Sequence, residues 1–413
     1  MLRAIDLRTE YKVNPLGLET KVPRLSWAVI SEKRCVVQCA YQIKCTSKSG
    51  CPANETCLIW DSGKVESEQS VCIGYDGEQL KSRQRVYWQV KVRDNYGEES
   101  GWSEPAFWEM GLLNKSDWEA KWIEPDIEED TSSSTPCPYL RKEFSTKGKI
   151  KKARIYITCH GLYQLTINGQ KATDQLFTPG WTSYAKRLQY QVFDVTNLLN
   201  SEKNAIGIIL GDGWYRGFLT WTGKKNLYGD KTALLLQLEL EYEDGKKEIV
   251  VTDDTWKATT GPILKSDIYN GETYDARLEK TGWDKSGFDD KTWKGAIVKT
   301  YDKNILVASE GSPMRITQTI KPIKKFVTPK GELVFDLGQN MVGWVKFKLK
   351  GAAGTKITLR HAEVLDKDGN FYTENLRAVK AEDQYIFKGE GIETYEPHFT
   401  FHGFRYVMVS DYN

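Results

Sequence analysis

The sequence predicts an all-β protein built from tandem β-sandwich domains. Aromatic residues make up 12% of the 413 residues, and aromatic and β-branched residues favour strands. Apolar and polar residues alternate along many segments, while the 3.6-residue spacing of an amphipathic helix is almost absent. A chain of this length exceeds one ordinary domain, so two or three domains are expected.

The first predicted domain covers residues 1–112. Trp88, Val90 and Val92 alternate with polar residues before a turn at residues 94–97. Several short strands within about 100 residues are typical of a fibronectin type III-like or immunoglobulin-like sandwich. An acidic run and a Ser/Thr/Pro stretch then predict a linker over residues 113–136.

The second and third predicted domains are also sandwiches. Leu234, Leu236 and Leu238 alternate with polar residues, and Asp244-Gly245 signals a hairpin. Residues 137–305 have the size and strand density of a jelly roll. Residues 306–413, where apolar residues alternate with lysines over 345–350, predict a further β-sandwich.

Charge and cysteine content exclude several classes of function. The chain has 58 Lys+Arg and 56 Asp+Glu, a net charge of +2, so no strong field attracts nucleic acid or a membrane surface. No apolar run approaches the roughly 18–20 residues of a membrane-spanning helix. The first residues do not resemble a signal peptide, which favours a cytoplasmic location with reduced thiols on the eight cysteines.

Several short motifs are decoys. The segment GDGWYRG (211–217) lacks dinucleotide-binding spacing and a following helix. His361-Ala-Glu363 lacks the cysteine pair of a deaminase and is interpreted as strand. The carboxylate pairs Asp253-Asp254 and Asp289-Asp290 lie in turn-like contexts, so neither is assigned as a catalytic dyad.

Loop-like segments of the second domain combine aromatic and polar residues. Flat aromatic faces beside carboxylates and amides suit a sugar, and Asp and Asn oxygens with sugar hydroxyls suit Ca²⁺. The alternative is that the aromatic residues are core and the polar residues form turns. The aromatic residues concerned are Trp181, Tyr184, Trp214, Tyr215, Trp221 and Tyr228.

A set of longer motifs resembles the bacterial α-L-rhamnosidases. The motifs include DLRTEYKVNPLGLETKVPRLSW, PGWTSYAKRLQYQVFDVT, LGDGWYRG, SDIYNGETYDAR, DLGQNMVGWVKFKLKG and FTFHGFRYV, in the family's order from Asp6 to Val407. The resemblance implies an immunoglobulin-like or fibronectin-like domain, a jelly roll related to a rhamnose-binding module, and a further, concanavalin-like β-sandwich over residues 306–413. In the family an (α/α)₆ barrel with the catalytic carboxylates follows, so we transfer no catalytic residue to this chain.

The resemblance also implies a ligand site. Asp174, Gln175 and Asn226 are the candidates for sugar and calcium ligands, with Asp174 and Asn226 on the metal. Gln175 departs from the family pattern. The residues expected to line the sugar pocket are Trp214, Tyr215, Glu272 and Tyr274.

The expected function is that of the non-catalytic N-terminal portion of an α-L-rhamnosidase. Its expected partners are L-rhamnose or rhamnose-terminated glycans and a catalytic helical domain in cis or in trans. An apolar patch for that domain is expected on the third sandwich. The alternatives are a glycosidase competent on its own and an interaction scaffold without a ligand.

Overall fold

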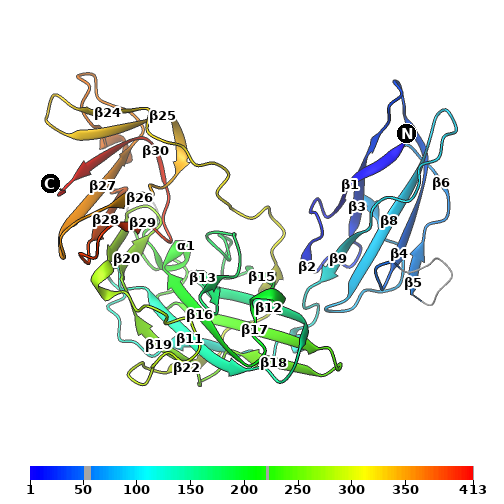
Figure 1. Ribbon diagram of the computed structural model, residues 1–413, viewed down its shortest axis with the longest axis horizontal. Coiled ribbons are helices and arrows are strands. Elements are labelled where there is room, and N and C mark those ends of the chain that lie inside the picture. The colour runs from blue at the N-terminus through cyan, green and yellow to red at the C-terminus, as the bar shows by residue number, and fades with distance from the viewer. Residues whose placement is uncertain (51–56, 220–222, 413) are drawn as a thin grey trace. The chain divides into compact units, whose positions relative to one another are not determined.

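The computed structural model describes residues 1–50, 57–219 and 223–412, which form two compact units. One unit comprises Met1–Glu119 with Val307–Glu310, and the other Ala120–Leu306 with Gly311–Asn413. Strands dominate both units (Figure 1). The described residues include one α-helix, α1 (Gly213–Arg216), and no helix long and apolar enough to cross a membrane. The all-β prediction is confirmed.

The first unit is a sandwich of a three-stranded sheet, β1-β3-β7, and a six-stranded sheet, β2-β9-β8-β4-β5 with β6 beside β4. Strand β8 alternates between buried and partly exposed residues along its whole length, as predicted, so Trp88, Val90 and Val92 all enter the core. The elements are β1 (Arg3–Thr9), β2 (Leu16–Leu18), β3 (Arg24–Ile30), β4 (Gln38–Thr46), β5 (Leu58–Asp61), β6 (Val65–Glu66), β7 (Ile73–Gly74), β8 (Arg85–Asp94), β9 (Ala106–Met110) and η1 (Lys115–Asp117).

The cysteines are mostly free thiols. Six of those in the described part of the chain are free, among them the buried Cys45, Cys137 and Cys159. Cys57 is disulfide-bonded, so the expectation of reduced thiols is wrong at that position.

The second unit begins with a jelly-roll-like pair of sheets. Strand order is β22-β10-β17-β12-β15-β23 with β18 beside β17 in one sheet, and β14-β13-β16-β11-β19 in the other. The strands are β10 (Trp122–Pro125), β11 (Pro138–Ser145), β12 (Ile150–His160), β13 (Leu162–Ile167), β14 (Gln170–Lys171), β15 (Leu188–Asp194), β16 (Lys203–Gly211), β17 (Ala233–Tyr242), β18 (Lys247–Val251), β19 (Lys257–Thr260), β22 (Ala296–Lys299) and β23 (Leu306–Ala308), and η2 spans Thr196–Leu198.

Strand β17 shows how the sequence builds this core. The predicted hairpin joins β17 to β18, and Gly245 adopts the left-handed φ of 85° that its turn needs. Leu236 and Leu238 are fully buried against β12, as the alternation predicts. Leu235 and Gln237 are also buried, because the first half of the strand is covered on both faces.

Residues 113–136, expected as a linker, contain ordered structure. Strand β10 pairs with both β17 and β22 inside the jelly-roll sheet, and Trp122 and Ile123 are buried there. The acidic and Ser/Thr/Pro composition that favours a linker applies to the residues after this strand, not to the strand itself.

A second pair of sheets completes this unit. Strand order is β20-β21-β28-β27-β30-β25-β24, and β26 pairs with β29. Strands β20 and β21 precede residue 305, so the jelly-roll segment of the chain supplies two strands to this sheet. The elements are β20 (Ile263–Asp267), β21 (Gly271–Asp275), η3 (Ala276–Leu278), β24 (Lys324–Val327), β25 (Leu333–Gly343), β26 (Phe347–Leu349), β27 (Lys356–Ala362), η4 (Glu374–Leu376), β28 (Glu382–Ile386), β29 (Glu393–Tyr395) and β30 (His402–Ser410).

Candidate functional site

Two parallel tryptophans form an aromatic platform on the second unit. The rings of Trp181 and Trp214 are stacked with centroids 5.8 Å apart and an interplanar angle of 5°. Trp214 is buried, whereas Trp181 is 51% exposed. The indole nitrogen of Trp181 donates to the Tyr228 hydroxyl at 3.3 Å, which fixes the ring from one side. The exposed Trp181 ring therefore offers a flat apolar face to solvent while its other face rests on the buried Trp214 ring.

Trp214 is held in place by the short helix α1 that follows strand β16. Gly213, the first residue of α1, has φ 55°, and a Cβ there would lie 2.5 Å from Cγ of Leu162. Only glycine therefore fits at this entry to the helix. Phe177 contacts Trp214 edge to face and extends the aromatic cluster toward the third sandwich.

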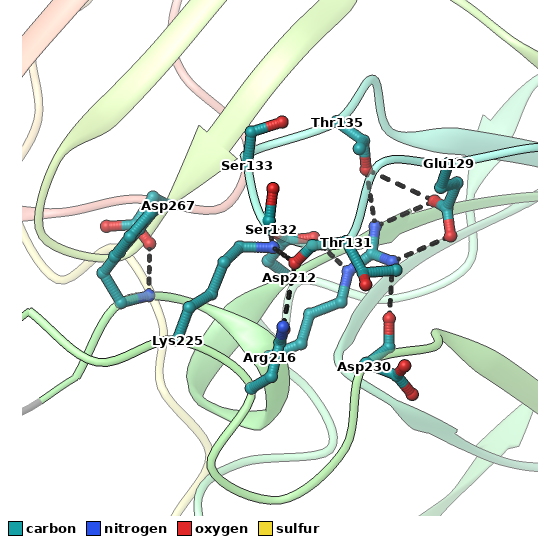
Figure 2. A network of polar contacts seen from close by, with 12 residues as sticks. Glu129, Thr131, Ser132, Ser133, Thr135, Asp212, Arg216, Lys225, Asp230 and Asp267 are labelled. Carbon is teal, nitrogen blue, oxygen red and sulfur yellow. Dashed lines mark hydrogen bonds and ion pairs between the residues drawn. The ribbon is translucent and has the colours of Figure 1, made fainter.

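A buried ion network lies beneath α1 (Figure 2). The Arg216 guanidinium donates to both Glu129 oxygens, at 3.0 and 3.1 Å, and also pairs with Asp212. Burial alone would raise the pKa of Glu129, but the contact with Arg216 outweighs burial and lowers it. Arg216 also donates to Thr135, so the 129–135 segment is tied to the helix.

The same network positions Asn226, one of the predicted ligands. Its side-chain amide donates to the Thr131 carbonyl at 2.8 Å, and its Oδ1 is buried with no hydrogen-bond partner among the described residues. The Lys225 ammonium lies 3.7 Å from Asp212. Asn226 Oδ1 is thus available to a ligand, and it lies beside Asp212, whose charge is already neutralised by Arg216 and Lys225.

The other predicted metal ligand, Asp174, lies on an exposed loop. Its carboxylate is 71% exposed and pairs with Arg315 at 2.7 Å. The neighbouring Gln175 donates its backbone N–H to the Thr173 hydroxyl. Asp174 and Asn226 offer the hard oxygen atoms that Ca²⁺ prefers, but the Arg315 contact must open before Asp174 can bind an ion.

Glu272 and Tyr274 lie on β21, away from α1 in the chain. Glu272 is fully buried and accepts from the Tyr395 hydroxyl at 3.1 Å and from the backbone and ring nitrogens of His398, both at 2.9 Å. The Tyr274 ring stacks on the His398 ring, with centroids 5.6 Å apart and planes 2° from parallel.

Tyr274 and His398 belong to the wall of a pocket of about 220 Å³. Glu272 stands behind this wall and holds His398 and Tyr395 in place. The Glu396 carboxylate accepts from the Trp344 indole at 3.3 Å and from Lys346 at 3.0 Å. Other lining residues are Gln164, Lys171, Phe177 and Trp344. Aromatic faces with amide and charged groups give this pocket the chemistry that binds polyhydroxylated ligands.

The predicted residues therefore divide between three places. Trp214, Tyr215 and Asn226 gather around α1, Asp174 and Gln175 lie on the loop before Phe177, and Glu272 and Tyr274 lie at the pocket. Tyr215 is buried against His160, with ring centroids 4.6 Å apart. Trp221 lies outside the described residues.

Sequence reasoning missed the position of Trp344 at the pocket. Trp344, which lies in the family-like motif DLGQNMVGW and to which the sequence assigns no ligand role, lines the pocket and contacts Phe177 edge to face at 6.1 Å. Trp181, one of the aromatic residues that the sequence suggests for a sugar, is the exposed member of the tryptophan pair. The pairing of Lys171 with Glu396 around one pocket had no sequence signal, since 225 positions separate them.

Comparison with known proteins gives a consistent result along the chain. Residues 4–114 match the family described as Rha78A-like, N-terminal immunoglobulin domain, and residues 148–318 match the alpha-L-rhamnosidase N-terminal domain. Residues 326–413 match the bacterial alpha-L-rhamnosidase concanavalin-like domain.

Individual relatives agree with these matches. An alpha-L-rhamnosidase of Formosa agariphila is 40% identical over 97% of this chain and 44% of its own length. The solved alpha-L-rhamnosidase of Aspergillus terreus has a TM-score of 0.94 at 36% identity, and covers all of this chain and 47% of its own. That of Streptomyces avermitilis, solved with L-rhamnose, has a TM-score of 0.94 at 31% identity over 56% of its length. The chain spans about half the length of these relatives.

Proposed function

Because this chain belongs to the α-L-rhamnosidase family, of which it carries the N-terminal β-domains, we propose that it is the non-catalytic, carbohydrate-binding portion of such an enzyme. Its ligand is L-rhamnose or a rhamnose-terminated glycan. A helical catalytic domain, in cis or in trans, performs the hydrolysis. The observation that carries this proposal is the exposed Trp181 face stacked on Trp214, whose ring Phe177 of the Asp174 loop contacts edge to face.

The chemistry of the platform supports a sugar ligand. The C–H face of a pyranose packs on an open indole, and the indole retains its hydrogen bond to Tyr228 while doing so. The Asp174 and Gln175 side chains, which precede Phe177 on the same loop, supply hydrogen-bond acceptors for hydroxyl groups. The solved Streptomyces avermitilis relative was crystallised with L-rhamnose, which supports this choice of sugar.

Calcium is part of the proposal. Asp174 and Asn226 lie on separate segments and would have to share the ion, and a bound Ca²⁺ would supply coordination to vicinal sugar hydroxyls. Within this chain, Arg315 competes for Asp174, and Thr131 fixes the Asn226 side chain so that its Oδ1 is the atom left for a ligand. Calcium and L-rhamnose therefore should bind cooperatively, because each completes the site of the other.

We assign the catalytic role to another domain because carboxylates of the adjacent pairs Asp253-Asp254 and Asp289-Asp290 already bond to other residues of this chain. The Asp253 carboxylate accepts from the backbone and hydroxyl of Thr255 within a turn. Asp290 is paired with the buried Arg141. Hydrolysis of a glycoside needs one carboxyl that protonates the leaving oxygen and another that activates water or attacks the sugar, and neither pair is placed to do this.

The docking of a catalytic domain has a candidate surface on the third sandwich. Ile323, Val327 and Val342, on or next to β24 and β25, are 64–74% exposed. Contact with a protein partner would cover these side chains, and the helical domain of the family is the partner we propose.

Titration calorimetry tests the binding proposal. We expect heat on adding L-rhamnose in the presence of Ca²⁺, less heat in the presence of a chelator, and none in Asp174→Ala. A wild-type chain that gives no heat and an unchanged melting temperature with L-rhamnose and Ca²⁺ would indicate a scaffold without this ligand.

Turnover separates the accessory portion from a competent glycosidase. Purified chain at high concentration should release no product from an aryl α-L-rhamnoside above the blank. Release that persists through purification would establish that a β-domain performs the chemistry itself.

A further inference from the structure

We propose that the third sandwich contains a buried site for a divalent transition-metal ion, best suited to Zn²⁺. The ligands are His361 Nε2, Asp383 Oδ2 and His402 Nε2, which lie within 4.8 Å of one another. Oδ2 of Asp383 is 3.1 Å from Nε2 of His402 and 3.9 Å from Nε2 of His361. Ligands of a tetrahedral zinc ion lie about 3.3 Å apart for bonds of about 2.0–2.1 Å, so the three atoms need only small shifts.

Three adjacent strands bring these residues together. Asp383 is on β28, His361 on β27 and His402 on β30, and β27 lies between the other two. Asp383 pairs directly with Leu359, so its side chain lies on the same face as Leu359 and, two residues further, His361. All three ligands are buried, at 0–3% exposure.

A hydrogen bond determines which nitrogen of His361 is free. Nδ1 lies 2.9 Å from the Ala381 carbonyl oxygen, which can only accept, so Nδ1 carries the hydrogen. In the neutral ring the lone pair is then on Nε2. Nε2 is buried and has no hydrogen-bond partner among the described residues. Its nearest charged neighbour is the Asp383 carboxylate, so two electron-rich atoms face each other, and a cation between them resolves this conflict.

The surrounding contacts are those that orient metal ligands. Histidine ligands typically donate their second N–H to a backbone carbonyl, as His361 does to Ala381. Oδ1 of Asp383 accepts the backbone N–H of Glu272 at 2.9 Å, so Oδ2, which lies 3.1 Å from His402 Nε2, is the oxygen that faces both histidines. The His402 ring stacks on the His361 ring, with centroids 4.1 Å apart.

The donor set selects the class of metal. Two imidazole nitrogens and one carboxylate oxygen suit Zn²⁺ and related late divalent ions. Ca²⁺ and Mg²⁺ prefer all-oxygen sites, so this site is distinct from the calcium proposal at Asp174 and Asn226. The inference does not rest on the carbohydrate function, and its failure would leave that function untouched.

The competing account is a network held by a proton alone. In it, the His402 N–H donates to Asp383, and His361 Nε2 stays unpaired in the core. An unpaired buried acceptor destabilises the fold, and the metal removes this cost while it joins three strands. The two accounts differ in one measurable quantity, the metal content.

Metal analysis of the untagged chain tests the proposal. Protein produced in zinc-supplemented medium and passed over a chelating column should retain one zinc ion per chain by plasma mass spectrometry. Production with cobalt should give visible d–d absorption of a tetrahedral ion. His361→Gln should lose both signals. His160→Gln, which changes another buried histidine outside the cluster, should keep both.

Two results would overturn the proposal. One is a wild-type chain, folded and produced with zinc, that carries no metal above the buffer blank and gives no cobalt spectrum. The other is a His361→Gln chain that retains as much zinc as the wild type. Asp383→Asn provides a second variant, and the wild-type measurement decides the matter even if both variants fail to fold.

Discussion

The indole of Trp181 lies parallel to that of Trp214 at a centroid distance of 5.8 Å, with one face covered and the other open. Trp214 is held by α1 and is 5% exposed, whereas Trp181 is half exposed. The pair is rigid because Tyr228 fixes Trp181 from the side. A rigid, exposed aromatic face binds a ligand without losing side-chain freedom on binding.

Trp181→Ala should weaken L-rhamnose binding with little effect on folding. An aromatic contact contributes about 0.5–1.5 kcal/mol beyond buried area, so the dissociation constant should rise roughly two- to tenfold or more. Calorimetry measures this change. The control is Trp102→Ala, which removes a 38% exposed tryptophan from the first unit. Equal affinities for L-rhamnose in the Trp181 variant and the wild type would show that the sugar does not bind on the Trp181–Trp214 platform.

Arg216→Met should strongly destabilise the second unit. The variant leaves Glu129 and Asp212 buried, at 8% and 3% side-chain exposure, with their main counter-charge gone. Breaking a buried pair from one side costs about 3–5 kcal/mol. Guanidinium unfolding followed by tryptophan fluorescence measures it.

The matched control for Arg216 is Lys246→Met in the same unit. Its pair with Asp244 is a surface contact, since the lysine side chain is 81% exposed. Exposed pairs contribute about 0–1 kcal/mol, so this variant should unfold almost as the wild type does. Similar losses in the two variants would show that the Arg216 network adds nothing beyond surface charge.

His160 should make the stability of the second unit fall in mild acid. Burial between Trp122, Tyr215 and Tyr301 lowers the pKa of His160 to about 4. The unfolded chain, with a pKa near 6.5, takes up the proton first. The stabilisation is therefore complete above pH 6.5 and is lost as the pH falls toward 4, to a maximum of about 3 kcal/mol.

His160→Phe isolates this contribution because it keeps an aromatic ring between Trp122 and Tyr215. Between pH 7 and 4.5 the unfolding free energy of the wild type should fall relative to that of the variant, because only the wild type has this histidine, which binds a proton more readily in the unfolded chain. Parallel curves would mean that His160 does not titrate differently in the folded chain.

The sequence predicts which residues form strands better than it predicts which strands pair with each other. The alternation along β8 and β17 identified Trp88, Leu236 and Leu238 as core, since period two is a local property. The pairing of β21 with β28 was not predictable in this way, because it joins Thr273 to Gln384 across more than 100 residues. Strand β10 was hidden for another reason: four residues are too few to show a period, and acidic composition follows them.

The residues of the candidate site could be predicted in part, but their contacts could not. Resemblance supplied Tyr274 and Glu272, but not that Glu272 lies behind the pocket wall with His398 and Tyr395 on its oxygens. Trp344 lies between strands β25 and β26, and nothing in the local sequence distinguishes a tryptophan that packs between sheets from one that lines a pocket. Its actual place depends on Phe177 from the jelly roll, which only the tertiary structure brings near.

Glu272→Gln should disrupt the wall of the pocket beside Trp344. It therefore distinguishes binding in this pocket from binding on the Trp181–Trp214 platform. The carboxylate accepts three hydrogen bonds in a fully buried position. An amide can accept through only one of its two ends, so at least one donor loses its partner, at about 1–3 kcal/mol. Melting temperature measures this loss. Glu279→Gln is the control, because the Glu279 carboxylate likewise accepts from a tyrosine hydroxyl, that of Tyr274, but its side chain is 33% exposed.

The ligand affinity of the same variant locates the sugar. If L-rhamnose binds on Trp181, its affinity in Glu272→Gln should equal that of the wild type at a temperature where both are folded, since Glu272 contacts neither tryptophan of the platform. If the sugar binds in the pocket, displacement of His398 and Tyr274 should weaken it together with the melting temperature. Our proposal requires the first result, and a parallel loss of both would move the binding site to the pocket beside Trp344.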